Sequence, residues 1–408
     1  MADALPTVRK TRFVCVSDTH NATPNGSFKL PKGDVLLHAG DLTNQGTFSE
    51  LKKTIKWIEE ADFEAKIVIA GECGGILDEQ RLTLGGNHDI TLDTDFYNQY
   101  GMYFHNQNPE DPAKCQELLE QAPSILWLKH EHAVINLVSP SGPQTTFKIF
   151  GSPFSPTQGM WAFGYGPDEA YQLWDQVPLD SDIVVTHTPP KYHCDETRER
   201  RAVGCEGLRN ALWRVRSRLA VCGHVHEGRG VECVRWDLDA SNIKYKESKV
   251  IAWEDPGRDN NKKLSIVDLT TKSGNPLDND GSVGDYSQPD TATINVVREP
   301  VPILSPLKGG GLEAPSTSAK PSAKLGVSQI TANLLAVPTQ TLPPATRGQG
   351  GTPPSQRCDL AALSGRMGRQ ETCIVNAAIM ASSWPRNGAK KFNKPIVVDI
   401  DLPVWKKG

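Results

Sequence analysis

Five short motifs contain the residue types that bind divalent cations or transfer protons. In chain order they are Asp18-Thr19-His20, Gly40-Asp41, Gly86-Asn87-His88-Asp89, Thr186-His187 and Gly223-His224-Val225-His226. Carboxylates supply negative charge, neutral imidazoles supply nitrogen and one amide supplies oxygen, a donor set that suits Mn, Fe, Zn or Mg. No cysteine belongs to these motifs, which argues against a structural zinc site. A carboxylate in such a set can bridge two cations that activate water against a phosphate ester.

Most of these motifs follow short runs of apolar and β-branched residues that stop at Gly, Pro or a polar residue, which is typical of strands. The runs are Phe13–Ser17, Val35–Ala39, Lys66–Ala70, Thr146–Phe150, Ile183–Val185 and Leu219–Cys222. Between them, Ser49–Glu60 and Leu208–Arg218 have apolar residues on one helical face. Strands that alternate with helices predict a mostly buried α/β sheet. Ligands of such sheets bind where the strands end, so distant residues can converge there.

The overall composition excludes several classes of protein. The 408 residues suffice for one large domain or two ordinary ones. A formal net charge of −4 gives no argument for binding nucleic acid or an anionic membrane. No run of 18 apolar residues and no apolar signal core is present, so we expect no membrane span. Nine cysteines without a CxxC pair indicate free thiols and a cytoplasmic location.

The composition changes near Glu254 and predicts how the chain is divided. Residues 256–368 are rich in Pro, Gly, Ser, Thr and Asp, and their apolar runs are brief. We expect this stretch to be a mostly disordered insertion, with a small second domain as the alternative. Strand-like runs return at Thr372–Met380 and Lys394–Ile400. The prediction is therefore a main domain over 11–255, the insertion, and strands in 369–408 that complete the domain.

The five motifs, in this order, resemble the calcineurin-like metallophosphoesterase superfamily. The flanking sequences FVCVSDTHN, DVLLHAGDLT, GNHDITLD, VVTHTPP and CGHVHEGRG resemble its metallophosphoesterase-domain-containing subgroup, which is related to cyclic-nucleotide phosphodiesterases. The resemblance covers roughly residues 11–255 and 370–404. It implies a two-sheet α/β sandwich that is flanked by helices and holds two metal ions at one edge.

The resemblance also implies a role for each motif residue. Seven side chains would hold two divalent cations: Asp18, His20 and His226 the first, Asn87, His187 and His224 the second, and Asp41 both. A hydroxide between the cations would attack phosphorus opposite the leaving oxygen. His88 would face the substrate and protonate the leaving group or stabilise the charge of the transition state.

Other residues have weaker indications of function. His38 lies within an apolar run and is expected to be a core residue, and no motif surrounds His105, His130 or His132. His193 is close enough to His187 in sequence to reach substrate. Three arginines could meet a phosphate or form a solvated loop face: Arg198, Arg200 and Arg201. Trp161 could stack on a base or pack in the core.

One departure from the family pattern precedes Asn87. Relatives run from the strand directly into the motif, whereas here Gly71 is followed by ECGGILDEQRLTLGG. We hypothesise that residues 72–86 are a translated intron, because their codons can contain the donor-like GTGAGT, the branch-point-like CTGAC and an acceptor-like TTAGG. The alternative is a real loop in which RLTLGG replaces KIVIAG as the strand that leads to Asn87. Under either interpretation the second metal site is less secure than the first.

These observations lead to one principal hypothesis of function and two alternatives. We expect a dinuclear-metal hydrolase whose substrate is a small phosphate ester, with a phosphodiester such as a cyclic nucleotide as the leading candidate. One alternative is a phosphomonoesterase or protein phosphatase. The other is a metal-binding interaction protein whose activity is impaired by the insertion before Asn87. The sequence leaves the oligomeric state and the identity of the metal open.

Overall fold

The computed structural model describes residues 8–24, 26–70, 88–157, 159–237, 247–258, 261–272, 274–279, 297–299, 369–381 and 390–405. All of them belong to one unit, formed by Met1–Val301 and Arg366–Gly408. Within the described residues, no helix is long and apolar enough to cross a membrane.

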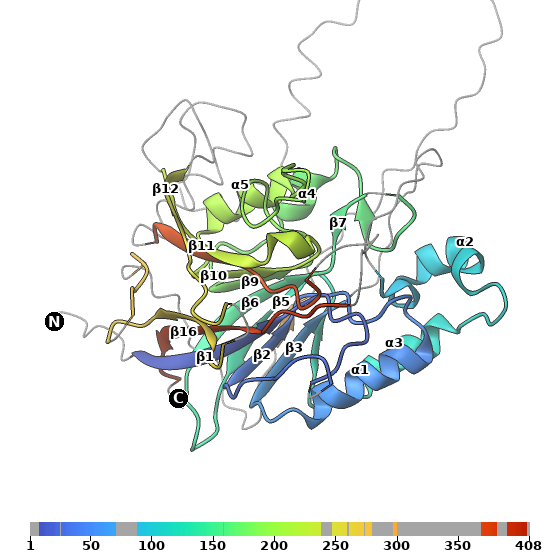
Figure 1. The fold of residues 1–408 in the computed structure, drawn as a ribbon, viewed down its shortest axis with the longest axis horizontal. Coiled ribbons are helices and arrows are strands. Elements are labelled where there is room, and N and C mark those ends of the chain that lie inside the picture. The colour runs from blue at the N-terminus through green and yellow to red at the C-terminus, as the bar shows by residue number, and fades with distance from the viewer. Residues whose placement is uncertain are drawn as a thin grey trace, which may run out of the picture. The chain divides into compact units, whose positions relative to one another are not determined.

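The first sheet contains six strands in the order β13-β16-β1-β2-β3-β4. Their bounds are β1 (Val8–Val16), β2 (Val35–His38), β3 (Ala65–Ile69), β4 (Leu126–Leu128), β13 (Ser265–Leu269) and β16 (Ile396–Pro403). Strands β1 to β4 are parallel, and β16 is antiparallel to β1. The carboxyl ends of β1, β2 and β3 therefore meet at one edge of the sheet, where two of the motifs begin (Figure 1).

The second sheet contains eight strands in the order β12-β11-β15-β10-β9-β6-β5-β14. Their bounds are β5 (Glu131–Asn136), β6 (Thr146–Ser152), β9 (Ile183–Thr186), β10 (Leu219–Cys222), β11 (Gly230–Trp236), β12 (Glu247–Ala252), β14 (Val297–Glu299) and β15 (Glu371–Asn376). The neighbours β6, β9, β10 and β15 are parallel. A separate small ribbon pairs β7 (Ser155–Pro156) with β8 (Gly164–Tyr165).

The two sheets pack face to face, and helices cover their outer faces. Phe13 and Cys15 of β1 join Phe147 and Ile149 of β6 in the inner core, whereas Val14 belongs to the outer core under the helices. The helices are α1 (Phe48–Glu60), α2 (Thr94–His105), α3 (Pro112–Glu120), α4 (Ala170–Trp174) and α5 (Glu206–Val215), with 3-10 turns at Ile90–Leu92 and His226–Gly228. Helices α1 to α3 lie beside the first sheet, and α4 and α5 lie over the second (Figure 1). The predicted two-sheet α/β sandwich flanked by helices is confirmed.

Most of the predicted elements are found, with small changes at their ends. The helix predicted at Ser49–Glu60 is α1, which begins after a capping box formed by Thr47 and Glu50. The helix predicted at Leu208–Arg218 is α5, which ends earlier, at Val215. Arg216 takes a left-handed conformation with φ of 49°, and its buried side chain donates to the carbonyl of Trp213. The apolar pattern continues past this turn, so it could not mark the helix end.

Three predictions about strands need correction. Strand β6 continues through Gly151-Ser152, where the sequence suggested a stop, and β15 ends at Asn376 rather than Met380. Residues 65–69 form β3 between β2 and β4, so the alternative in which RLTLGG replaces KIVIAG as that strand is wrong. The residues of that insertion themselves lie outside the described residues.

Strand β13 lies beyond residue 255, where the insertion was predicted to begin. Ser265–Leu269 pairs in parallel with β16, and Asn279 donates to the carbonyl of Glu371. The short run LSIV therefore belongs to an edge strand, and only its pairing with β16 identifies it as a strand. Residues 280–296 and 300–368, on which most of the predicted insertion falls, lie outside the described residues.

Candidate active site

Strand ends from both sheets bring together six of the motif residues, which we call the Asp/His cluster. Its members are Asp18, His20, Asp41, His187, His224 and His226. Strands β1 and β2 of the first sheet lead to the first three, and β9 and β10 of the second sheet lead to the other three. Five of the six are buried, and His224 is partly buried. The seventh predicted ligand, Asn87, lies outside the described residues.

One side of the cluster contains a carboxylate and two imidazoles. Ligand atoms of Asp18, His20 and His226 all lie within 4.8 Å of one another. The Nε2 atom of His226 is 3.3 Å from Asp18 Oδ1 and 3.3 Å from His20 Nε2. Three donor atoms that point at one small space form the kind of site that a divalent cation occupies.

The other side of the cluster is centred on Asp41. Ligand atoms of Asp18, Asp41 and His187 also lie within 4.8 Å of one another, and so do those of His20, Asp41 and His88. The two oxygens of Asp41 face different histidines, since Oδ1 is 3.5 Å from His187 Nε2 and Oδ2 is 3.6 Å from His20 Nε2. Asp41 therefore lies between the two halves of the cluster.

Backbone carbonyls fix the protonated nitrogen of two histidines. His20 Nδ1 lies 3.1 Å from the carbonyl oxygen of Thr43, and His187 Nδ1 lies 2.8 Å from that of Ala39. A carbonyl can only accept, so Nδ1 carries a proton in both rings. Nε2 of His20 presents its lone pair to the cluster, whereas Nε2 of His187 faces Asp41 Oδ1 at 3.5 Å. Among the described residues, His224 Nδ1 is buried without a hydrogen-bond partner. Buried lone pairs of this kind fit cation binding and are costly otherwise.

The electrostatics of most of the cluster favour the protonation states that a cation requires. Burial opposes the charge of Asp18, but the hydrogen bond with His226 prevails and lowers the pKa of Asp18 to about 2. Burial lowers the pKa of His20 to about 3 and that of His224 to about 4, so both rings are neutral at pH 7. His187 differs: burial disfavours its charge, but the neighbouring Asp41 raises its pKa to about 9. A cation that binds there must displace this proton.

The backbone of the cluster is held in a conformation that L-residues seldom adopt. The angle φ is 50° at Asp18, 42° at His20, 51° at Asp41 and 65° at His224. Such conformations each cost on the order of 1–3 kcal/mol and concentrate at functional sites. Gly40 also has a positive φ of 90°, and a Cβ there would lie 2.6 Å from His187 Nδ1. Only glycine lets β2 lead into the cluster this closely.

Two residues support the cluster in roles that the sequence did not predict. The buried carboxylate of Asp89 accepts from Leu42 N at 3.0 Å and from Thr43 N at 2.9 Å, which fixes the loop that carries Asp41. Burial, together with the nearby charge of Asp41, raises the pKa of Asp89 to about 7. The Asn376 side chain donates to Val225 O at 2.8 Å and so holds the turn between His224 and His226. In the sequence, the one indication of these roles was position: Asp89 ends a motif, and Asn376 follows an apolar run.

His88 lies at the more exposed side of the cluster. Its backbone N–H donates to Asp41 Oδ1 at 2.8 Å, and its Nδ1 donates to the carbonyl of Asn44 at 2.6 Å. The ring is partly exposed and lies 4.3 Å, centroid to centroid, from the ring of Trp161. His88 is therefore anchored at Nδ1 and can present Nε2 to a bound molecule.

A family model described as calcineurin-like phosphoesterase matches residues 11–228, which is more than half of the chain. The chain belongs to the calcineurin-like phosphoesterase family. Members of this family use two divalent metal ions, and the Asp/His cluster provides candidate ligands for both.

Related proteins each match a little over half of the chain. "Probable rhamnogalacturonate lyase C" of Emericella nidulans is 40% identical over 229 residues, 56% of this chain and 18% of that protein. Human "Metallophosphoesterase domain-containing protein 1" is 35% identical over 228 residues, 54% of this chain and 62% of that protein. The chain thus spans less than two thirds of either relative. The solved purple acid phosphatase PPD1 of yellow lupin has a TM-score of 0.27 and 13% identity, covering 65% of this chain and 43% of that one.

The other candidate residues lie outside the Asp/His cluster. His38 is fully buried, as predicted, and its Nε2 lies 3.0 Å from Thr19 Oγ1. His193, the candidate for touching substrate, is buried between Glu232 and Glu247. The arginines form a solvated loop face, because Arg198 and Arg200 are exposed and pair with glutamates.

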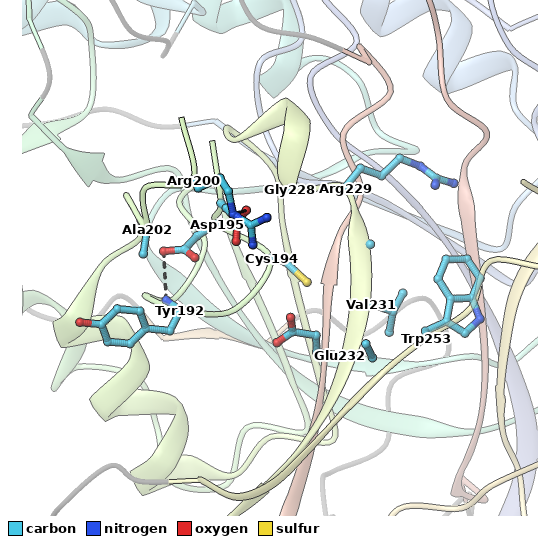
Figure 2. Close-up of a pocket in the computed structure, with 13 residues that line it drawn as sticks. Tyr192, Cys194, Asp195, Arg200, Ala202, Gly228, Arg229, Val231, Glu232 and Trp253 are labelled. Atoms are coloured by element: carbon cyan, nitrogen blue, oxygen red, sulfur yellow. Dashed lines mark hydrogen bonds and ion pairs between the residues drawn. The ribbon is translucent and has the colours of Figure 1, made fainter. Parts of the chain in front are cut away.

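A cavity of about 620 Å³ is lined in part by Gly228, Arg229 and Gly230, which follow His226 in the chain. Figure 2 shows its lining, in which Asp195 accepts from the backbone N–H of Tyr192 at 3.0 Å. Arg229 pairs with Asp255 at 3.0 Å, and Glu232 with His193 at 2.8 Å. Each of these charged side chains has a partner within the protein, so we assign no chemistry to the cavity.

Proposed function

We propose that this chain is a metal-dependent phosphoesterase that hydrolyses a phosphodiester such as a cyclic nucleotide. The observation that supports it most is the position of Asp41, whose two oxygens face His187 and His20 in different groups of donor atoms. A carboxylate placed in this way suits the bridge of a two-metal site. The proposed ligands are Asp18, His20 and His226 for one ion, Asn87, His187 and His224 for the other, and Asp41 for both.

The chain's own residues prepare this site for binding and turnover. When bound, two divalent cations (Mn, Fe, Zn or Mg) would supply the positive charge that acidifies water and stabilises phosphate oxygens. Asp18 and Asp41 provide the opposing negative charge, and the carbonyls of Thr43 and Ala39 keep His20 and His187 in the tautomer that presents Nε2. The loops already adopt their unusual positive φ angles without bound ions. We therefore expect little reorganisation of the backbone when the ions bind.

His88 is the proposed proton donor to the leaving oxygen. Its Nδ1 donates to Asn44, so only Nε2 is available to a substrate. Its backbone N–H donates to Asp41, which fixes the ring at the edge of the proposed bridge. A protonated His88 in this position would neutralise the charge that develops as the P–O bond breaks.

The neighbourhood of His88 supports a substrate with a nucleobase. The Trp161 ring is partly exposed, lies 4.3 Å from the His88 ring and is backed by Phe104 at 5.3 Å. An indole beside the proposed proton donor could stack on the base of a nucleotide whose phosphate is at the cluster. This placement favours the base-stacking interpretation of Trp161 over simple core packing.

A panel of substrates tests the proposal. The full chain, loaded with Mn²⁺, is assayed with 2′,3′-cyclic AMP, 3′,5′-cyclic AMP, 5′-AMP and a phosphoserine peptide, and Asp41→Asn serves as the inactive control of the same shape. We expect cleavage of a cyclic nucleotide to exceed cleavage of the monoester. Hydrolysis of 5′-AMP or the peptide alone would instead indicate a phosphomonoesterase or a protein phosphatase, and absence of turnover with metal bound would indicate an interaction protein.

The location of the chain is a further part of the proposal. All seven cysteines among the described residues are free thiols, which supports a reducing compartment such as the cytoplasm. Fractionation of cells that produce the chain tests this assignment, and recovery from an oxidising compartment would contradict it.

A further inference from the structure

Two cysteines face each other across neighbouring strands of the second sheet. Cys233 of β11 and Cys373 of β15 are direct partners in the antiparallel register. Both side chains are on the face that packs against the first sheet, since Cys373 belongs to the inner core and Cys233 packs against it. Neither residue belongs to the Asp/His cluster or to its supporting contacts.

The backbone hydrogen bonds place this pair at a position where side chains come closest. Trp236 N donates to Gln370 O at 3.0 Å, which makes 236/370 a hydrogen-bonding position between the strands. Because these positions alternate along antiparallel strands, the pair 233/373 is non-hydrogen-bonded. Consistent with this, Cys373 N donates to Arg218 O, towards β10 and away from β11. Such pairs have Cα atoms about 4.5 Å apart, within the range of roughly 4.4–6.8 Å that disulfides require.

The two thiols also interact directly and differ in exposure. The neighbouring Cys373 thiol outweighs the effect of burial and lowers the pKa of Cys233. Cys233 is partly exposed, whereas Cys373 is fully buried. A small reagent therefore reaches Cys233 first. The sulfur of Cys373 is then the nearest partner for an oxidised Cys233.

We propose that Cys233 and Cys373 are a dithiol site that a peroxide converts reversibly into a disulfide. The Cys233 thiolate attacks one peroxide oxygen, the O–O bond breaks, and the released hydroxide takes up a proton to give water. Cys233 is then a sulfenic acid. The Cys373 sulfur loses its proton and attacks the Cys233 sulfur, and the sulfenic oxygen leaves as a second water. One peroxide is reduced and two thiols are oxidised, and an external dithiol reverses the reaction.

The disulfide would join the two strands that support the turn containing His224 and His226 of the Asp/His cluster. Strand β11 begins at Gly230, just after the turn that contains His226, and β15 ends at Asn376, which holds the same turn. In the unfolded chain the bond would close a loop of more than 100 residues, so it should stabilise the fold. We expect the thermal midpoint to rise by about 5 °C on oxidation, after allowance for some strain in the bond.

Peptide mapping of the oxidised full chain tests the proposal. The purified chain is treated with one equivalent of hydrogen peroxide, remaining thiols are blocked with N-ethylmaleimide, and peptides are mapped without reduction. We expect one cross-linked pair that joins Cys233 to Cys373 and disappears on treatment with dithiothreitol. Cys115→Ala, which removes a buried cysteine on α3, should retain the cross-link and the rise in thermal midpoint, whereas Cys233→Ala should lose both.

Three results would overturn the proposal. They are a disulfide between Cys233 and a different cysteine, oxidation of Cys233 to a sulfinic acid while Cys373 remains reduced, and labelling of both thiols by N-ethylmaleimide after peroxide treatment. The variant Cys373→Ala gives an independent check that does not need the cross-link to form. Without its partner, Cys233 should proceed to sulfinic acid under the same treatment.

Discussion

Two groups of buried histidines and carboxylates differ in how their ring nitrogens are satisfied. His193 Nδ1 lies 2.8 Å from Glu232 and its Nε2 lies 3.0 Å from Glu247, so both nitrogens have an acceptor. In the Asp/His cluster, His224 Nδ1 is buried without a hydrogen-bond partner among the described residues. Burial beside a carboxylate therefore does not identify a metal ligand. A buried lone pair that the protein leaves unsatisfied is the more informative sign.

The largest expected effect comes from the bridging position of the Asp/His cluster. Asp41→Asn keeps the shape of the side chain but removes the charge that both proposed cations share. We expect the kcat for a cyclic nucleotide to fall by at least about 10²-fold. The near-UV circular dichroism should be unchanged, which distinguishes loss of the site from loss of the fold. Near-normal turnover by a folded Asp41→Asn chain would contradict the assignment.

The same substitution at a histidine of each group should separate binding from stability. His193→Gln leaves Glu232 and Glu247 without their shared cation, and we expect the free energy of unfolding to fall by about 2–3 kcal/mol. His187→Gln retains a donor for the carbonyl of Ala39 but lacks the imidazole nitrogen. We expect activity to fall by about 10²-fold, and the free energy of unfolding of the metal-free form to fall as well near pH 7, because Asp41 loses the protonated ring beside it.

Urea unfolding without metal and turnover with Mn²⁺ measure these two effects. The comparison between the groups fails if His193→Gln, at equal folded fraction, loses as much activity as His187→Gln.

A smaller effect, on KM, is expected from Trp161, which is partly exposed beside His88. Trp161→Ala removes the proposed stacking surface beside His88 and should raise the KM for a cyclic nucleotide about 10-fold, as loss of one stacked base predicts. A cyclic phosphodiester without a base serves as the control substrate, and its KM should stay within about twofold. Equal changes for both substrates would assign Trp161 to packing rather than to recognition of a base.

The pH dependence of the unfolding free energy should show that His193 is protonated between Glu232 and Glu247. Burial disfavours the protonated ring, but Glu232 and Glu247 prevail and raise the pKa of His193 above 6.5. A raised folded pKa stabilises the protein fully below the unfolded value of 6.5, and this contribution is lost as the pH rises through the folded value. We therefore expect the difference in unfolding free energy between the parent chain and His193→Gln to be larger at pH 6 than at pH 9.5. A difference that grows with pH would contradict a charged His193.

Sequence reasoning succeeded where the signal was local. Asp18, Asp41 and His187 each follow a short buried strand, and parallel pairing is enough to bring such strand ends together. It failed where the deciding contact is distant in sequence. Asp89 supports Thr43 and Asn376 supports Val225, across separations that no periodicity records. Strand β13 was missed for the same reason, because an edge strand of Ser265–Leu269 is defined by its pairing with β16 rather than by its own pattern.

The number of metal ions per chain tests the two-cation site most directly. Calorimetric titration with Mn²⁺, followed by metal analysis and a turnover assay on the same sample, should be done on the full chain and on a form without residues 72–86. We predict two ions per chain and turnover that appears as the second ion binds, with the shorter form binding the second ion at least as tightly. One ion or none in both forms, without turnover, would contradict the two-cation site.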